Sequence, residues 1–181
     1  MSFMGEPFSP EFYPHMPYVW QAVKDNPRHT VLMLTKQPQN LLQYSPFPEN
    51  VWVGCSATNT PSYQDAYRGL AEVEAKVRFI SFEPLLGAIY TQGLCQIPPY
   101  YNPRRFPFDW AIIGARSPYS VKTFPRWDWV KEIIEACDNS GIPVFLKNNL
   151  RLPKYSCEGA IPFYKKVGGT MELRQEFPNN E

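Results

Sequence analysis

The chain has 181 residues, of which 44% are hydrophobic and 19% are charged, and its formal net charge is +1. This length and balance are typical of one globular domain with a buried core, and they exclude an intrinsically disordered chain. The near-neutral charge gives no electrostatic reason to expect duplex DNA or an anionic membrane as a partner. No uninterrupted apolar run approaches the ~20 residues that span a bilayer, and the N-terminus lacks a secretory signal, so we expect a cytoplasmic protein.

The four cysteines lie far apart in the sequence and form no C-x-x-C pair. This spacing favours reduced thiols over a zinc module or a dense disulfide scaffold. The four are Cys55, Cys95, Cys137 and Cys157.

The first predicted helix is amphipathic, because apolar residues recur at the spacing of one helix face from Met16 to Val23. Short apolar runs at 30–36 and 51–57 then predict two strands. The opening residues 2–5, "SFMG", indicate one more strand ahead of this helix.

A second helix is predicted between the strand at 51–57 and the next one. Ser62 with Asp65 three residues later resembles an acidic capping box, and apolar residues continue to Val73. The stretch that follows, "VRFISFEPLLG" at 77–87, has the β-branched and aromatic content of a buried strand up to Glu83, where a proline makes further pairing unlikely.

The rear of the chain repeats this alternation after an irregular excursion at 88–108 that is rich in proline and aromatic residues. A strand is predicted at 109–116, a helix from Trp127 to Cys137, and a strand at 143–149. Continuous apolar runs separated by helices are typical of parallel sheets. We therefore expect an α/β fold, a partial (βα) TIM-like barrel of about five to six strands over 1–150, with residues 151–181 as a C-terminal tail packed on it or extending from it.

Polar residues follow the apolar part of all five of these strands. The carboxyl ends of parallel strands converge on one edge, called here the mouth, so these side chains are expected to face a common cavity. Three of them are cations suited to phosphate or carboxylate, and a carboxylate there could bind an amino group, a ribose hydroxyl or a proton in transit. The strand-end residues are Lys36, Ser56, Glu83, Arg116 and Lys147, and glycines that permit a sharp turn or a close approach, Gly54 and Gly114, precede two of them.

A structural reading competes with this one. Strands of any α/β protein become polar where they emerge into solvent, and opposite charges at the mouth can simply pair with one another. His15 and His29 have no nearby ligand partner in the sequence, so no metal or catalytic role is assigned to them. Aromatic and basic residues alternate at 100–106, as in sites for single-stranded nucleic acid, but aromatic residues spaced by prolines more often pack a loop onto its own protein.

An ordered set of motifs resembles an uncharacterised, phage-associated family related to radical S-adenosylmethionine (SAM) proteins. The resemblance covers about residues 1–150 and is carried by "LTKQPQ", "VWVGCSATN", "RFISFEPLLG", "DWAIIGARS" and "VFLKNN". It implies a partial or full βα barrel. By position it also points to the same strand ends, with Ser117 added: Lys36, Ser56, Glu83, Gly114, Ser117 and Lys147.

The chain departs from this family in its front part. Family members carry an upstream segment with clustered cysteines that would hold a [4Fe-4S] cluster binding SAM, and no such cluster of cysteines occurs in this sequence. The chain also has "GARS" where the family has "GGES", and "KNNL" in place of "KQWG". SAM and a [4Fe-4S] cluster are therefore expected only if a cysteine-bearing N-terminal half is supplied.

Two functions remain open from the sequence. The first is the C-terminal barrel part of a radical-SAM-like enzyme, with Glu83 as its candidate catalytic residue and an anionic small molecule as ligand. The second is a catalytically inactive binding or interaction protein that kept the fold. Because a barrel without its first strands exposes an unpaired edge, the expected partner is a second copy of the chain or a separately encoded N-terminal half.

Overall fold

A computed structural model describes residues 6–90, 106–118, 120–154 and 161–178. The strand predicted at 2–5 and the basic, aromatic part of the excursion at 91–105 lie outside these residues.

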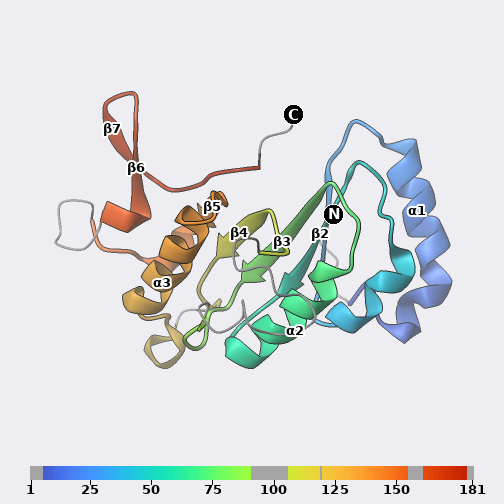
Figure 1. Ribbon diagram of the computed structural model, residues 1–181, viewed down its shortest axis with the longest axis horizontal. Helices are drawn as coiled ribbons and strands as arrows, with labels where there is room; N and C mark the ends of the chain where they lie inside the picture. The colour runs from blue at the N-terminus through green and yellow to red at the C-terminus, as the bar shows by residue number, and fades with distance from the viewer. Residues whose placement is uncertain (1–5, 91–105, 119, 155–160, 179–181) are drawn as a thin grey trace.

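One sheet of five parallel strands forms the centre of the protein (Figure 1). Each strand pairs with the next one in the sequence, so the spatial order is β1-β2-β3-β4-β5. The predicted α/β fold with parallel strand–helix alternation is confirmed. Among the described residues the sheet is not closed into a barrel, and β1 and β5 form its two edges. The strands are β1 (Val31–Thr35), β2 (Val51–Ser56), β3 (Val77–Phe82), β4 (Trp110–Ile113) and β5 (Val144–Leu146).

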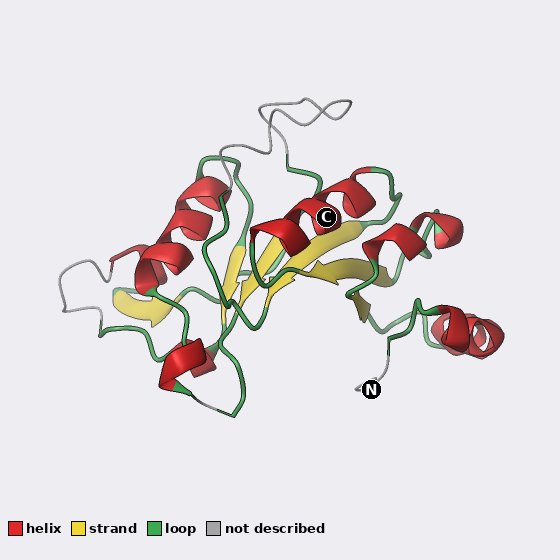
Figure 2. Ribbon diagram, turned by 90° about the horizontal axis from the view of Figure 1, so that it is seen from below, coloured by secondary structure: helices red, strands yellow, loops and turns green. Residues whose placement is uncertain are grey.

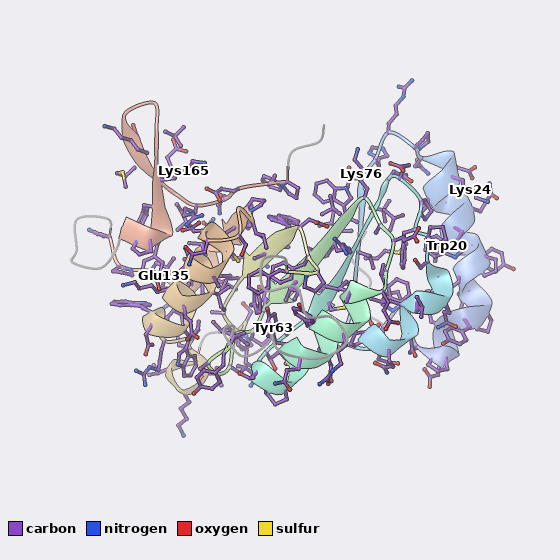
Figure 3. All side chains as sticks on the ribbon, in the orientation of Figure 1. Trp20, Lys24, Tyr63, Lys76, Glu135 and Lys165 are labelled. Carbon is purple, nitrogen blue, oxygen red and sulfur yellow. The ribbon has the colours of Figure 1, made fainter. Side chains whose placement is uncertain are left out.

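Three α-helices alternate with these strands: α1 (Met16–Asp25), α2 (Thr60–Ala71) and α3 (Trp127–Asp138). α2 and α3 lie along the same side of the sheet (Figure 2). They are held there by apolar burial, as at Tyr63 of α2, which is fully buried with its ring 5.8 Å from that of Phe82 (Figure 3).

The start of α2 differs from the prediction. The capping residue is Asn59, whose side chain accepts a hydrogen bond from the backbone N–H of Ser62, while the Ser62 hydroxyl caps the backbone N–H of Asn59. Ser62 therefore belongs to the capping box as its third helical residue rather than as its first member. Asp65 instead pairs with Arg68 one turn later, at 3.2 Å.

The two faces of the sheet bury different residues because side chains alternate along a strand. The helix side carries the main core, including Val53, Ile80 and Ile113. The opposite side, called here the inner face, carries a smaller cluster of Trp52, Val77, Phe79 and Trp110, with Ile112 and Phe145 packed against it. On β1 this alternation assigns Leu32 and Leu34 to the inner face, and they are 47% and 39% exposed.

The C-terminal part adds a feature that the sequence did not predict. An antiparallel hairpin of β6 (Tyr164–Val167) and β7 (Thr170–Leu173) is followed by residues 174–177, called here the strap. The strap runs antiparallel along the free edge of β5, with a backbone bridge between Gln175 and Phe145. Phe177 then packs on the rings of Trp110 and Phe145, at 5.4 and 5.2 Å.

None of the helices in the described ranges is both long and apolar enough to cross a membrane.

Candidate functional site

The mouth brings Glu83 and Lys147 together across one intervening strand. Lys147 follows β5 and Glu83 follows β3, yet the Lys147 Nζ lies 2.8 Å from the Glu83 carboxylate. Gly114, which follows β4 between them, makes this contact possible. A Cβ atom at that position would lie 2.9 Å from the Glu83 Cδ and Oε1 atoms, so the carboxylate passes over a residue without a side chain.

Asn149 completes this arrangement, and the sequence analysis did not single it out. Its amide Nδ2 donates to Glu83 Oε1 at 3.3 Å and to the carbonyl of Ala115 at 2.8 Å. Its Oδ1 accepts from the Ala115 backbone N–H at 3.1 Å. The side chain thus ties the turn after β5 to the end of β4 while it contacts Glu83. The only signal in the sequence was its place two residues after Lys147.

Glu6 is a second residue of the mouth that the sequence analysis missed. Its carboxylate accepts hydrogen bonds from the hydroxyl of Thr35 and, at 2.8 Å, from the backbone N–H of Lys36. It therefore sits at the carboxyl end of β1. Glu6 directly follows the strand predicted at 2–5, so the pattern of polar residues at strand ends could have pointed to it, but the sequence analysis did not extend that pattern to this strand.

The other predicted residues are placed at the mouth but are not brought into contact with the Glu83–Lys147 pair. Lys36 is exposed after β1, and Ser56 ends β2 opposite Ser81 of β3. Arg116 and Ser117 are exposed in the loop after β4. The predicted convergence thus joins Glu83, Gly114 and Lys147, and leaves two cations, Lys36 and Arg116, on the rim.

The charges at the mouth limit what it can bind. Lys147 offsets the charge of Glu83, and with side chains 42% and 26% exposed this pair remains reachable by solvent. An ion pair of this exposure contributes little to stability by itself, of the order of 1 kcal/mol or less. The pair can instead exchange partners with a ligand: Lys147 can donate to an anionic oxygen, and Glu83 can accept from an amino or hydroxyl group.

A separate cavity of about 620 Å³ lies at the amino end of the sheet. Lys76 and Lys165, labelled in Figure 3, line it together with acidic residues and the strap. Its charged groups are largely paired: Arg174 bonds Asp138 at 2.7 Å and Glu176 at 3.1 Å, and Lys165 bonds Glu176 at 3.2 Å. These contacts hold the strap in place, and we assign no ligand to this cavity.

The described cysteines do not fit a cluster-binding role. Cys55 in β2 and Cys137 in α3 are free thiols buried in the main core on the helix side of the sheet. Burial raises the pKa of the Cys137 thiol to about 12, and burial followed by the nearby Glu6 charge raises that of Cys55. The described residues contain only two cysteines, each buried on a different core element, whereas a [4Fe-4S] cluster of this kind needs three cysteine ligands close together. Cys95 and Cys157 lie outside the described residues.

The chain matches the model of a known protein family. Residues 4–169 match the model of the DUF5131 family, which is described as a protein of unknown function. Because the match covers most of the chain, the protein belongs to this family. Searches of curated proteins and of solved structures found no match.

Proposed function

We propose that this member of the DUF5131 family binds an anionic or nucleotide-like small molecule at the mouth of its sheet, as the C-terminal part of a phage-associated, radical-SAM-like enzyme. The observation that carries the proposal is the Glu83–Lys147 pair, which crosses Gly114 and is tied to Asn149 at the carboxyl end of a parallel sheet. In open and closed α/β folds this end of the strands is where ligands bind.

Each residue of the mouth has a proposed role. Lys147 donates to an anionic oxygen of the ligand, and the rim cations Lys36 and Arg116 add charge attraction. Glu83 is the candidate catalytic residue, because a carboxylate held by a cation and an amide is positioned to accept a proton or to bind an amino or hydroxyl group. Ser56 and Ser117 offer hydroxyl groups at the same edge.

A [4Fe-4S] cluster with bound SAM would supply radical chemistry in such an enzyme. The described residues offer only two cysteines, both buried in the core, so we assign no reaction step to this chain through that group. In this proposal the cluster comes with a cysteine-bearing N-terminal half.

Binding at the mouth is tested by calorimetry with inorganic pyrophosphate and with ATP as probes. Lys147→Ala should weaken binding of whichever probe the wild type binds by roughly 10- to 100-fold, because a charge-assisted contact of about 1.5 to 3 kcal/mol is lost. Lys131→Ala is the matched control, since Lys131 only forms an exposed pair with Glu135 on α3. Wild-type protein that binds neither probe, or equal affinities of wild type and Lys147→Ala, would contradict the proposal.

A second candidate function is that of a binding or interaction protein that is not itself catalytic. It is favoured by β1, an edge strand whose inner-face residues Leu32 and Leu34 are 47% and 39% exposed. Exposed apolar side chains on an edge strand are typical of a strand-docking surface, since natural proteins otherwise cover or charge such edges.

The two expected partners would use this edge differently. A second copy can pair its β1 antiparallel to this one. Two copies cannot continue the sheet by parallel β1–β1 pairing. Parallel strands would require a twofold axis that runs along them, and rotation about this axis turns the sheet over. The inner face of one copy would then lie beside the helix side of the other. A parallel strand from a separately encoded N-terminal half would continue the sheet with its inner face aligned. Parallel extension therefore favours a different chain.

A further inference from the structure

The strap reaches the mouth as well as the edge of β5. The Gln175 side chain donates to the carbonyl of Leu146 at 3.1 Å and to Asn148 Oδ1 at 3.2 Å. These two acceptors belong to the residues directly before and after Lys147. The last part of the described chain thus contacts the turn that carries the lysine of the proposed site.

The backbone around Lys147 is held from two sides. On one side, the Lys147 N–H donates to the carbonyl of Ile113 in β4 at 2.9 Å. On the other side, the N–H of Leu146 donates to the carbonyl of Arg174 in the strap at 2.8 Å. Gln175 adds its two side-chain bonds on the strap side. β5 has only three residues, so few contacts of its own fix the direction in which it ends.

The strap is itself anchored at a distance from the mouth. Glu176 donates its backbone N–H to the Val144 carbonyl at 3.0 Å, and its own carbonyl accepts from the Trp110 indole N–H at 2.8 Å. Arg174 bonds Asp138 of α3 at 2.7 Å. Because these anchors lie in α3 and toward the amino end of the sheet, the position of Gln175 is set independently of the charges at the mouth.

We propose that Gln175 is a positioning residue for Lys147, acting through the carbonyl of Leu146 and the side chain of Asn148. This inference rests on the proposed function, because it concerns the same site. The strap orients the turn after β5 so that Lys147 reaches across Gly114 to Glu83, and the ligand meets a preorganised cation.

The test measures the contact between Lys147 and Glu83 with and without Gln175, and it needs no ligand. Lysines of the full chain are reductively methylated with ¹³C, which keeps their charge, and the methyl groups are observed by NMR spectroscopy. The NMR signal of Lys147 is the one that is absent from the spectrum of Lys147→Arg. The change in this signal caused by Glu83→Gln is then recorded in the wild-type and in the Gln175→Ala backgrounds, as a double-mutant cycle. We expect Glu83→Gln to shift the signal less than half as much in the Gln175→Ala background.

Two further variants test whether the N–H donor of Gln175 is the cause and whether any change near the strap has the same effect. Gln175→Glu preserves the size of the side chain but has no N–H donor, and it should give the same loss as Gln175→Ala. Glu172→Gln, at an exposed position of β7, should leave the cycle unchanged. A response to Glu83→Gln that is equal in the wild-type, Gln175→Ala and Gln175→Glu backgrounds would overturn the inference, as would an equal loss of response in the Glu172→Gln background.

Ligand affinity gives a second and separate readout. If pyrophosphate or ATP binds the wild type, Gln175→Ala should weaken that binding about threefold to tenfold, as expected for loss of one or two neutral hydrogen bonds. Unchanged affinity for a probe that Lys147→Ala no longer binds would overturn the positioning role. If the wild type binds neither probe, the proposed ligand site is contradicted but the positioning role is not. The response of the Lys147 signal then still shows whether Gln175 positions that lysine.

Discussion

At the scale of single residues, two glycines on either side of β3, one in β2 and one directly after β4, allow the side chains of Phe79 and Glu83 to cross them in opposite directions. A Cβ at Gly54 of β2 would lie 2.4 Å from the ring of Phe79, and one at Gly114 after β4 would lie 2.9 Å from the Glu83 carboxylate. Both contacts fall on the inner face. They differ in what must move if the glycine is replaced, because Phe79 is buried and the end of Glu83 is partly exposed.

Replacing Gly114 with alanine should therefore disturb the site more than the fold. The end of a glutamate side chain can rotate away from the new methyl group, so we expect Gly114→Ala to lower the free energy of unfolding by less than about 1 kcal/mol while it displaces Glu83 from Lys147. Thermal unfolding and the Lys147 signal described above measure the two effects. Gly54→Ala is the contrast: the Phe79 ring has nowhere to go, and a loss of roughly 1 to 3 kcal/mol or more is expected. Equal losses of stability in the two variants would contradict this account.

The sequence predicted part of this arrangement. Strand alternation and parallel pairing are enough to place Glu83 and Lys147 at one edge, and a strand-end glycine was expected to permit either a turn or a close approach. Asn149 could not be found in this way, whereas Glu6 directly follows the strand predicted at 2–5 and was overlooked there. Asn149 acts through a turn whose direction is set by contacts with β4, and the particular contact of Glu6 with the end of β1 depends on how the N-terminal segment packs. Such contacts depend on how segments pack, which spacing in one segment does not encode.

At the scale of elements, the strap lies along the free edge of β5 as an added strand would, and ion pairs of Arg174 and Glu176 hold it there. Glu176 accepts from the backbone N–H of Val144 at 3.1 Å and from Arg174, while Lys165 bonds its other oxygen. Burial alone would raise the pKa of this carboxyl group, but these donors outweigh it, and the pKa lies below its usual value. The ionised form is therefore the one that the folded state favours.

The pH dependence of stability follows from that direction. A depressed pKa in the folded state means that the contribution of Glu176 is fully present above the pKa of the unfolded state and is lost as the pH falls through the folded one. Glu176→Gln should lower the free energy of unfolding at pH 7 by about 1 to 2 kcal/mol, since charge-assisted bonds are replaced by neutral ones. The difference between variant and wild type should shrink below about pH 4.

Chemical denaturation at a series of pH values measures this effect. Glu172→Gln on the adjacent hairpin is the matched control, because it removes the same charge at an exposed position. A difference between Glu176→Gln and wild type that stays constant down to pH 3 would show that the ionised carboxylate is not what anchors the strap.

The sequence predicted the strands of the main sheet but not the C-terminal hairpin, for a physical reason. The five strands of the main sheet are short apolar runs, because both of their faces are at least partly covered, and that pattern is visible in the sequence. The hairpin of β6 and β7 has mostly exposed residues, so its strands carry no buried periodicity. Its turn residues, Gly168 and Gly169, adopt positive φ angles of 54° and 91°, which glycine permits.

At the scale of the whole molecule, the two edges of the sheet are treated differently. The strap covers the free edge of β5, whereas within the described ranges no strand is paired with the outer edge of β1. Along a parallel strand, the backbone N–H and C=O groups of successive residues point to opposite neighbours. The Val31 N–H bonds Asn50 on the β2 side, so the backbone groups of Leu32 and Leu34 point toward the outer edge. The same two residues place exposed side chains on the inner face.

Association through β1 is therefore expected at high protein concentration. Light scattering coupled to size-exclusion chromatography should show a dimer in equilibrium with monomer, and Leu34→Lys should shift the equilibrium to monomer, because a charge on the edge opposes strand pairing. Val121→Lys, at a position 77% exposed elsewhere, is the control. A wild type that stays monomeric at high concentration, and that dimerises only when residues 1–5 are deleted, would show that the chain covers this edge itself.

The antiparallel direction of the strap also decides whether such assemblies can grow without limit. Copies of a parallel open sheet could in principle stack head to tail, β1 of one on β5 of the next, and because that contact does not close on itself it would build a fibre. With the strap seated on β5, this contact has no acceptor strand, and pairing through β1 stops at two chains. We therefore expect residues 174–177 to prevent head-to-tail polymerisation, and a chain truncated before Arg174 to form filaments where the full chain forms at most a pair.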